Sequence, residues 1–130
     1  MEIDHIAIAG SSLDEALSTF RALYGLEPDR VEEVASDKIT EAMLPVANTH
    51  LQLLEPTDPS STVARFIERR GEGLHHIAVR VEDLEATLEH LRSQGAQLID
   101  EKPRVGGGGH RVAFVHPKTT HGILIELVER

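Results

Sequence analysis

Residues 4–25, DHIAIAGSSLDEALSTFRALYG, and residues 75–95, HHIAVRVEDLEATLEHLRSQG, are two copies of one pattern, and this pattern decides the fold. In each copy a histidine, His5 or His76, precedes a short apolar run. The following apolar segment begins at the same spacing from that histidine in both copies. An internal repeat of this kind indicates a fold assembled from two copies of one structural unit.

Each copy predicts a strand followed by a helix. Ile6 and Ile8 alternate with His5 and Ala7, which is the pattern of a half-buried strand. The helix has apolar residues at helical spacing and ends at Gly25, because glycine readily adopts the left-handed conformation found at helix C-termini. The second copy repeats both features. The expected N-cap residues are Ser12 and Asp83.

Three extended stretches follow each helix, as alternation and turn residues indicate. They lie near residues 31–35, 39–45 and 49–55 in the first half and near 97–102, 111–116 and 122–129 in the second. The sequence therefore predicts an α+β fold of two tandem βαβββ modules in a single domain, residues 1–130. Module one covers about residues 1–56 and module two about residues 74–130. A linker, about residues 57–73, contains one short helix capped by Ser60 or Ser61.

The composition is that of an ordinary water-soluble protein. Of 130 residues, 40% are hydrophobic and 27% charged, and no apolar run approaches the roughly 20 residues that span a bilayer. The absence of cysteine excludes disulfides and thiolate metal sites and favours a reducing compartment, so we expect a cytoplasmic protein. A net charge of -9 opposes binding to nucleic acid, whose phosphates attract Lys and Arg. Neither a membrane nor a nucleic acid is an expected partner.

Four polar residues occupy matching places in the apolar strands of the two modules. His5 and His76 lie in the first strand of each module, and Gln52 and Glu126 lie in the last. A buried imidazole or carboxylate is costly unless it is paired or bound to a metal. One divalent cation would satisfy all four groups, and this ligand set suits Co, Mn, Fe, Ni or Zn. The alternative is that the histidines make ordinary hydrogen bonds in the core or on the surface.

Four segments carry a resemblance to a known family. They are DHIAIA at 4–9, LQLLEP at 51–56, DPSSTVARFIERRGEGLHHIAVRVEDL at 58–84 and GGGGHRVAFVHPKTTHGILIELVE at 106–129. With these segments the sequence resembles the vicinal oxygen chelate (glyoxalase, bleomycin resistance, dioxygenase) superfamily, and within it the methylmalonyl-CoA epimerases. The resemblance covers essentially the whole chain.

This resemblance implies a fold, a cofactor and a reaction. The paired βαβββ modules would form a curved, partly open, barrel-like mixed sheet around a metal site. The positions that match the family's metal ligands are His5, Gln52, His76 and Glu126. They would hold one divalent metal ion, with cobalt first and Mn, Ni, Zn or Fe as alternatives. The implied reaction interconverts the (R) and (S) epimers at C2 of methylmalonyl-CoA through a metal-stabilised enolate. The implied partners are an acyl-CoA thioester substrate and a second copy in a homodimer.

Epimerisation requires an acid–base group on each face of C2, because a single base would largely return the proton to its original side. Glu41 matches a position where bacterial members of the family carry a proposed catalytic Glu, and Glu126 matches the proposed second base. His116 and Lys118, in HPKTTHG, are expected to contact the carboxylate or a phosphate of the substrate. A plain polar turn is the alternative for these two residues.

Three other activities of the superfamily stay open. A glyoxalase I-like isomerase would use the same modules and enolate chemistry on a glutathione hemithioacetal, commonly with Glu at the position of Gln52. An extradiol dioxygenase would bind iron through two His and one Glu, although such chains are usually longer. A metal-free ligand-binding protein of the bleomycin-resistance type would need none of the four ligands.

Overall fold

The computed structural model describes residues 1–130 and divides into two compact units. The N-terminal unit is His5–His75, and the C-terminal unit combines Met1–Asp4 with His76–Arg130. The predicted module one was about residues 1–56, but its first four residues, Met1–Asp4, belong to the C-terminal unit, and the linker helix belongs to the N-terminal unit. None of the helices has both the length and the apolar character needed to cross a membrane.

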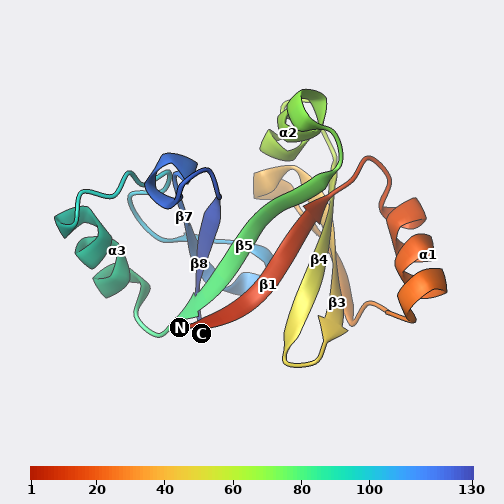
Figure 1. The fold of residues 1–130 in the computed structure, drawn as a ribbon, viewed down its shortest axis with the longest axis horizontal. Helices are drawn as coiled ribbons and strands as arrows, with labels where there is room; N and C mark the ends of the chain where they lie inside the picture. The colour runs from red at the N-terminus through yellow and green to blue at the C-terminus, as the bar shows by residue number, and fades with distance from the viewer. The chain divides into compact units, whose positions relative to one another are not determined.

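Four strands of the N-terminal unit lie in the order β2-β3-β4-β1 (Figure 1). β1 and β4 are parallel, and the other neighbouring strands are antiparallel. The strands predicted near residues 31–35, 39–45 and 49–55 are confirmed. The bounds of the strands are β1 (Glu2–Ala9), β2 (Arg30–Val34), β3 (Ile39–Val46) and β4 (Thr49–Pro56), and a short 3-10 helix (Ala35–Asp37) joins β2 to β3.

Helix α1 (Leu13–Tyr24) covers one face of these strands. Its predicted cap is confirmed, because Ser12 Oγ accepts a hydrogen bond from Glu15 N at 3.2 Å. Gly25 ends the helix in the left-handed conformation, with φ of 66°. The apolar side of the helix packs against strand residues that include Leu53.

Helix α2 (Thr62–Arg70) is the predicted linker helix. Of the two candidate caps Ser61 is the one used, and its Oγ accepts a hydrogen bond from Val63 N at 3.2 Å. The helix packs in a cluster that contains Ala9 and Leu54, which are paired in register on β1 and β4. Because consecutive strand residues point to opposite faces, α2 and α1 contact opposite faces of this sheet.

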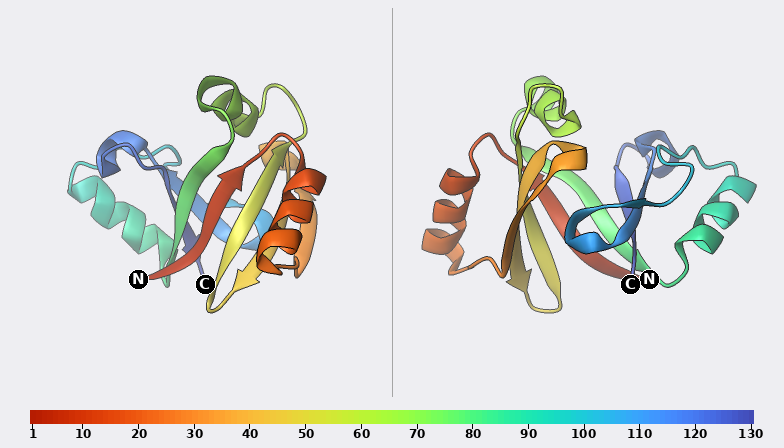
Figure 2. Two further views of the ribbon diagram at one scale, coloured as in Figure 1. Left: turned by 45° about the vertical axis from the view of Figure 1, so that its right-hand side comes forward. Right: turned by 180° about the vertical axis from the view of Figure 1, so that it is seen from behind.

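The strands of the C-terminal unit lie in the order β5-β8-β7-β6. β5 and β8 are parallel, and the remaining pairs are antiparallel. Helix α3 packs along one face of β7 and β8 (Figure 2), and its predicted cap is confirmed because Asp83 Oδ1 accepts a hydrogen bond from Ala86 N at 3.0 Å. The bounds are β5 (Gly73–Val81), α3 (Leu84–Ser93), β6 (Arg104–Val105), β7 (Arg111–Val115) and β8 (Ile125–Glu129), with 3-10 helices at Gly107–Gly109 and Pro117–Thr120.

The strand predicted near residues 97–102 is wrong. This segment forms only one isolated bridge, between Leu98 and Val115. The edge strand of the unit is instead the two-residue β6, which follows the predicted segment. The other two strands predicted for this half lie within residues 111–116 and 122–129 and are confirmed.

The side chain of Asp100 explains why no strand forms there. Its Oδ2 accepts a hydrogen bond from Phe114 N at 2.8 Å, so it uses a backbone donor that a neighbouring strand would otherwise pair with. Its Oδ1 accepts a hydrogen bond from Arg104 Nε at 3.3 Å. This carboxylate thus adds to the backbone hydrogen bonds that Ile99 N and Asp100 N donate to Phe114 O and that His116 N donates to Gln97 O.

We predict that Asp100→Ala lowers the free energy of unfolding by about 1–3 kcal/mol, because the backbone N–H of Phe114 loses its acceptor and Arg104 loses one partner. Urea denaturation measures this change. The matched control is Glu33→Ala, at an exposed position of β2, which should change the unfolding free energy by less than about 0.5 kcal/mol. Equal losses in the two variants would contradict the role of Asp100.

Candidate functional site

The N-terminal unit presents two of the predicted metal ligands on one face of its sheet. Gln52 of β4 pairs in register with Ala7 of β1. His5 lies two residues before Ala7 and therefore points to the same face. His5 is 5% exposed and Gln52 is 7% exposed, so both polar side chains are buried.

The amide oxygen of Gln52 is buried and accepts no hydrogen bond. Most buried polar side-chain atoms in proteins have a hydrogen-bond partner, and an orphaned acceptor requires an explanation. An amide oxygen is also a good ligand for a divalent cation. The amide oxygen of Gln52 is therefore suited to bind a divalent cation.

Glu41 lies on the same face of the sheet as Gln52. Met43 pairs in register with Gln52, and Glu41 is two residues before Met43 on β3. The carboxylate is 2% exposed, and its Oε2 accepts a hydrogen bond from Arg30 Nη2 at 2.8 Å. A buried carboxyl group that is held in place by one arginine could serve as a base.

The C-terminal unit brings together the other two predicted ligands. Glu126 of β8 pairs in register with Ala78 of β5, and His76 lies two residues before Ala78 on the same face. His76 Nε2 and Glu126 Oε1 are 3.4 Å apart, and both side chains are buried. An imidazole and a carboxylate at this separation could share a proton or bind one cation.

Phe114 packs against both of these residues. Its ring meets the ring of His76 edge-on, with 5.3 Å between centroids, and it is the register partner of Glu126. The guanidinium of Arg104 lies over the ring of Phe114, 5.5 Å from the ring centroid. Asp100, which holds the backbone of Phe114, also binds Arg104. This arrangement restricts the rotamers that His76 can adopt.

His116 and Lys118 lie at the end of β7, where the chain turns through the 3-10 helix Pro117–Thr120. His116 is half-buried, and its Nδ1 accepts a hydrogen bond from Lys118 N at 3.0 Å. The side chain of Lys118 is exposed. The imidazole therefore caps the turn, which gives it a structural role that the sequence did not indicate.

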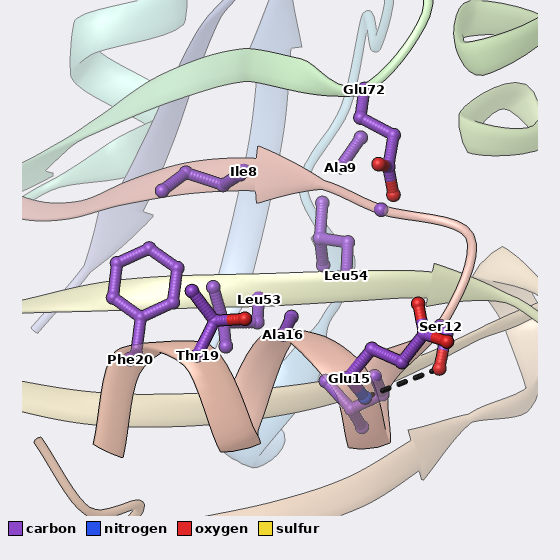
Figure 3. A pocket seen from close by; sticks show the side chains of 12 residues that line it. Ile8, Ala9, Ser12, Glu15, Ala16, Thr19, Phe20, Leu53, Leu54 and Glu72 are labelled. Carbon is purple, nitrogen blue, oxygen red and sulfur yellow. Dashed lines mark hydrogen bonds between the residues drawn. The ribbon is translucent and has the colours of Figure 1, made fainter. Parts of the chain in front are cut away.

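A pocket of about 240 Å³ lies beneath α1 (Figure 3). Its walls are mainly apolar and include Ala16 and Phe20 of the helix and Ile8 and Leu53 of the strands. Glu72 lies at its rim. None of the predicted ligands or bases lines this pocket. Ile8 and Leu53 point to the sheet face opposite that of His5 and Gln52, so the pocket is separate from the candidate site.

Sequence reasoning missed two residues of these surroundings. Arg30 begins β2 one residue before the expected strand, and its contact with Glu41 joins side chains of neighbouring strands. Phe114 lies within an expected strand, where alternation places it on the face opposite Val115. That alternation was the available signal for Phe114, whereas the contact with His76 requires the register of the strands.

A family model matches residues 4–114 of the chain. The model describes the glyoxalase/bleomycin resistance protein/dioxygenase superfamily. The match covers most of both units, and it agrees with the resemblance that the sequence motifs indicated.

Two curated relatives match almost the whole chain. The uncharacterized protein YqjC of Bacillus subtilis is 39% identical over 127 residues, which are 98% of this chain and 91% of the relative. The ethylmalonyl-CoA/methylmalonyl-CoA epimerase of Cereibacter sphaeroides is 33% identical over 127 residues, which are 96% of this chain and 95% of the relative.

A solved structure shows the same fold. It is a variant of the Streptomyces coelicolor methylmalonyl-CoA epimerase in complex with 2-nitronate-propionyl-CoA. The TM-score is 0.94 at 39% sequence identity, and the match covers 99% of this chain and 94% of the other. The predicted fold class and the predicted resemblance to these enzymes are confirmed.

Proposed function

Because the chain belongs to the glyoxalase/bleomycin resistance/dioxygenase superfamily, we propose that it is an enzyme that interconverts the (R) and (S) epimers at C2 of methylmalonyl-CoA. The observation that carries this proposal is its likeness to two epimerases over almost the full length of each, at 33% and 39% identity. The substrate class, an acyl-CoA thioester, follows from the same two proteins, one of which is in complex with an acyl-CoA.

A divalent metal ion is part of this proposal, with His5, Gln52, His76 and Glu126 as its ligands. His5, His76 and Glu126 are buried side chains of the types that bind transition-metal ions. The buried amide oxygen of Gln52, which accepts no hydrogen bond, fits the role of a further ligand. Two imidazoles with oxygen ligands suit Co, Mn, Ni, Zn or Fe. The donor set therefore fits the ion that the superfamily implies.

Removal of the C2 proton moves negative charge onto the thioester oxygen, and a bound divalent ion would supply Lewis-acid stabilisation of that charge. The chain must supply a base on each face of C2. Glu41 is suited to one face, because it is a buried carboxylate fixed by Arg30. Glu126 is assigned to the other face, where its contact with His76 limits its movement.

Two further residues are assigned to the anionic parts of the substrate. His116 Nδ1 accepts a backbone hydrogen bond, so the ring proton of the neutral imidazole lies on Nε2, which can donate to a carboxylate. Lys118 is exposed in the same turn and supplies a positive charge for a carboxylate or a phosphate.

We predict that the purified protein catalyses deuterium exchange at C2 of methylmalonyl-CoA in D₂O. Exchange should stop after treatment with EDTA and return when Co²⁺ is added, because the thioester oxygen then loses and regains its Lewis acid. NMR of the substrate follows the exchange, and elemental analysis of the protein follows the metal. Metal without C2 exchange would contradict the epimerase proposal. Turnover of a glutathione hemithioacetal in its place would favour the glyoxalase I-like reaction.

We predict that Glu41→Gln lowers the rate of C2 exchange at least about 100-fold while the metal content stays the same, because the amide cannot accept the proton. The control variant is Glu33→Gln, at an exposed position of the neighbouring strand, which should retain the wild-type rate. Wild-type exchange in Glu41→Gln would contradict its role as a base. Loss of metal from this variant would place Glu41 among the metal ligands instead.

A further inference from the structure

Arg30 and Glu41 form an ion pair on the sheet face that carries Gln52. Arg30 of β2 pairs in register with Met43 of β3, and Met43 pairs with Gln52 of β4. Arg30 Nη2 is 2.8 Å from Glu41 Oε2, and the two side chains are 34% and 2% exposed. The guanidinium therefore approaches Glu41 from the edge of the sheet, while the carboxylate is enclosed.

This pair differs from the surface ion pairs of the same unit. The carboxylate of Glu27 meets Arg21 at 2.6 Å, but those side chains are 59% and 55% exposed. Such exposed pairs contribute little to stability, because water screens their charges. The carboxylate of Glu41 is almost fully enclosed, so its orientation depends on the partner to which it is hydrogen-bonded.

Neither register partner of Glu41 carries a positive charge that could pair with its carboxylate. Glu32 of β2 is the register partner of Glu41, and Leu54 of β4 is its partner on the other side. Two carboxylates directly opposite each other destabilise a sheet. Arg30 lies two residues from Glu32, so its positive charge is on the same face as both carboxylates.

The ion pair between Arg30 and Glu41 uses a single hydrogen bond. Arginine commonly binds a carboxylate through two parallel hydrogen bonds. Here Arg30 binds only Oε2 of Glu41, and its buried Nε makes no hydrogen bond. The contact thus fixes one oxygen of the carboxylate and leaves the other, Oε1, outside the ion pair.

We propose that Arg30 is a positioning residue for Glu41, holding Oε2 so that Oε1 is directed at the C2–H bond of the substrate. This role rests on the proposed function. In the step concerned, the C2–H bond breaks, the proton moves to Oε1, and the electron pair stays on the substrate, delocalised onto the thioester oxygen. Arg30 itself exchanges no proton and touches no reacting atom.

The test compares kcat and KM for C2 exchange in Arg30→Lys, Arg30→Met, Glu41→Gln and the double variant Arg30→Met with Glu41→Gln. Misplacement of a catalytic group by about 1 Å can cost about 100-fold in rate. We expect kcat to fall about 10- to 100-fold in Arg30→Met and less in Arg30→Lys, which keeps the charge but not the planar fork. KM should change less than about twofold, because Arg30 acts through Glu41 on the proton transfer and does not bind the substrate.

The double variant separates positioning from general damage. If Arg30 acts only through Glu41, Arg30→Met should lower kcat no further once Glu41 is Gln. The matched control is Arg21→Met, which breaks the exposed ion pair with Glu27 and should keep wild-type kcat. Thermal unfolding of each variant shows whether it is folded at the assay temperature. If Arg30→Met does not fold, Arg30→Lys decides the question by the same two criteria, lower kcat and unchanged KM.

Wild-type kcat in folded Arg30→Met or in Arg30→Lys would overturn the role of Arg30. The role would also be overturned if Arg30→Met lowered kcat by the same factor in the wild-type protein and in the Glu41→Gln variant. These outcomes leave the proposed function intact, because the wild-type protein still exchanges C2. A wild-type protein without C2 exchange would refute the proposed function and, with it, the role of Arg30.

Discussion

Burial of polar side chains in otherwise apolar strands is the constraint on which the site depends. The five side chains concerned share strand faces whose other inward residues are mainly alanine, leucine, valine and methionine. Each would cost several kcal/mol if it were desolvated without a partner. The proposed cation offsets this cost for four of them, and Arg30 offsets it for the fifth. They are His5, Glu41, Gln52, His76 and Glu126.

Most of the fold could be predicted because its signals are local. The caps at Ser12 and Asp83 and the ending at Gly25 follow from the residues that flank each helix, and the repeat supplied each signal twice. The missing strand near residues 97–102 could not be predicted in this way. There the side chain of Asp100 accepts the hydrogen bond of Phe114 N in place of a backbone carbonyl, and such a contact exists only in the folded chain.

The site was predictable to the extent that alternation decides which strand residues point inward. Gln52 was identified by its place in an apolar strand and Glu41 by the family resemblance, and both are buried. Arg30 was not, because a partly exposed arginine at the start of an edge strand gives no sign of a partner two strand positions away on β3. At the position of Gln52 the amide contributes no charge, so the proposed ligand set has one carboxylate. A Glu at this position, as is common in the glyoxalase I-like alternative, would add a second carboxylate and one more negative charge to the ligand set.

The central proposal is that His5, Gln52, His76 and Glu126 are ligands of one divalent ion. Anomalous X-ray diffraction at the cobalt edge, from crystals grown with equimolar Co²⁺, tests it most directly. The account predicts a single anomalous peak per chain, about 2.0–2.2 Å from a nitrogen of His5 and of His76 and from an oxygen of Gln52 and of Glu126. A peak that lacks contact with one or more of these four side chains, or a peak elsewhere in the chain, would contradict it.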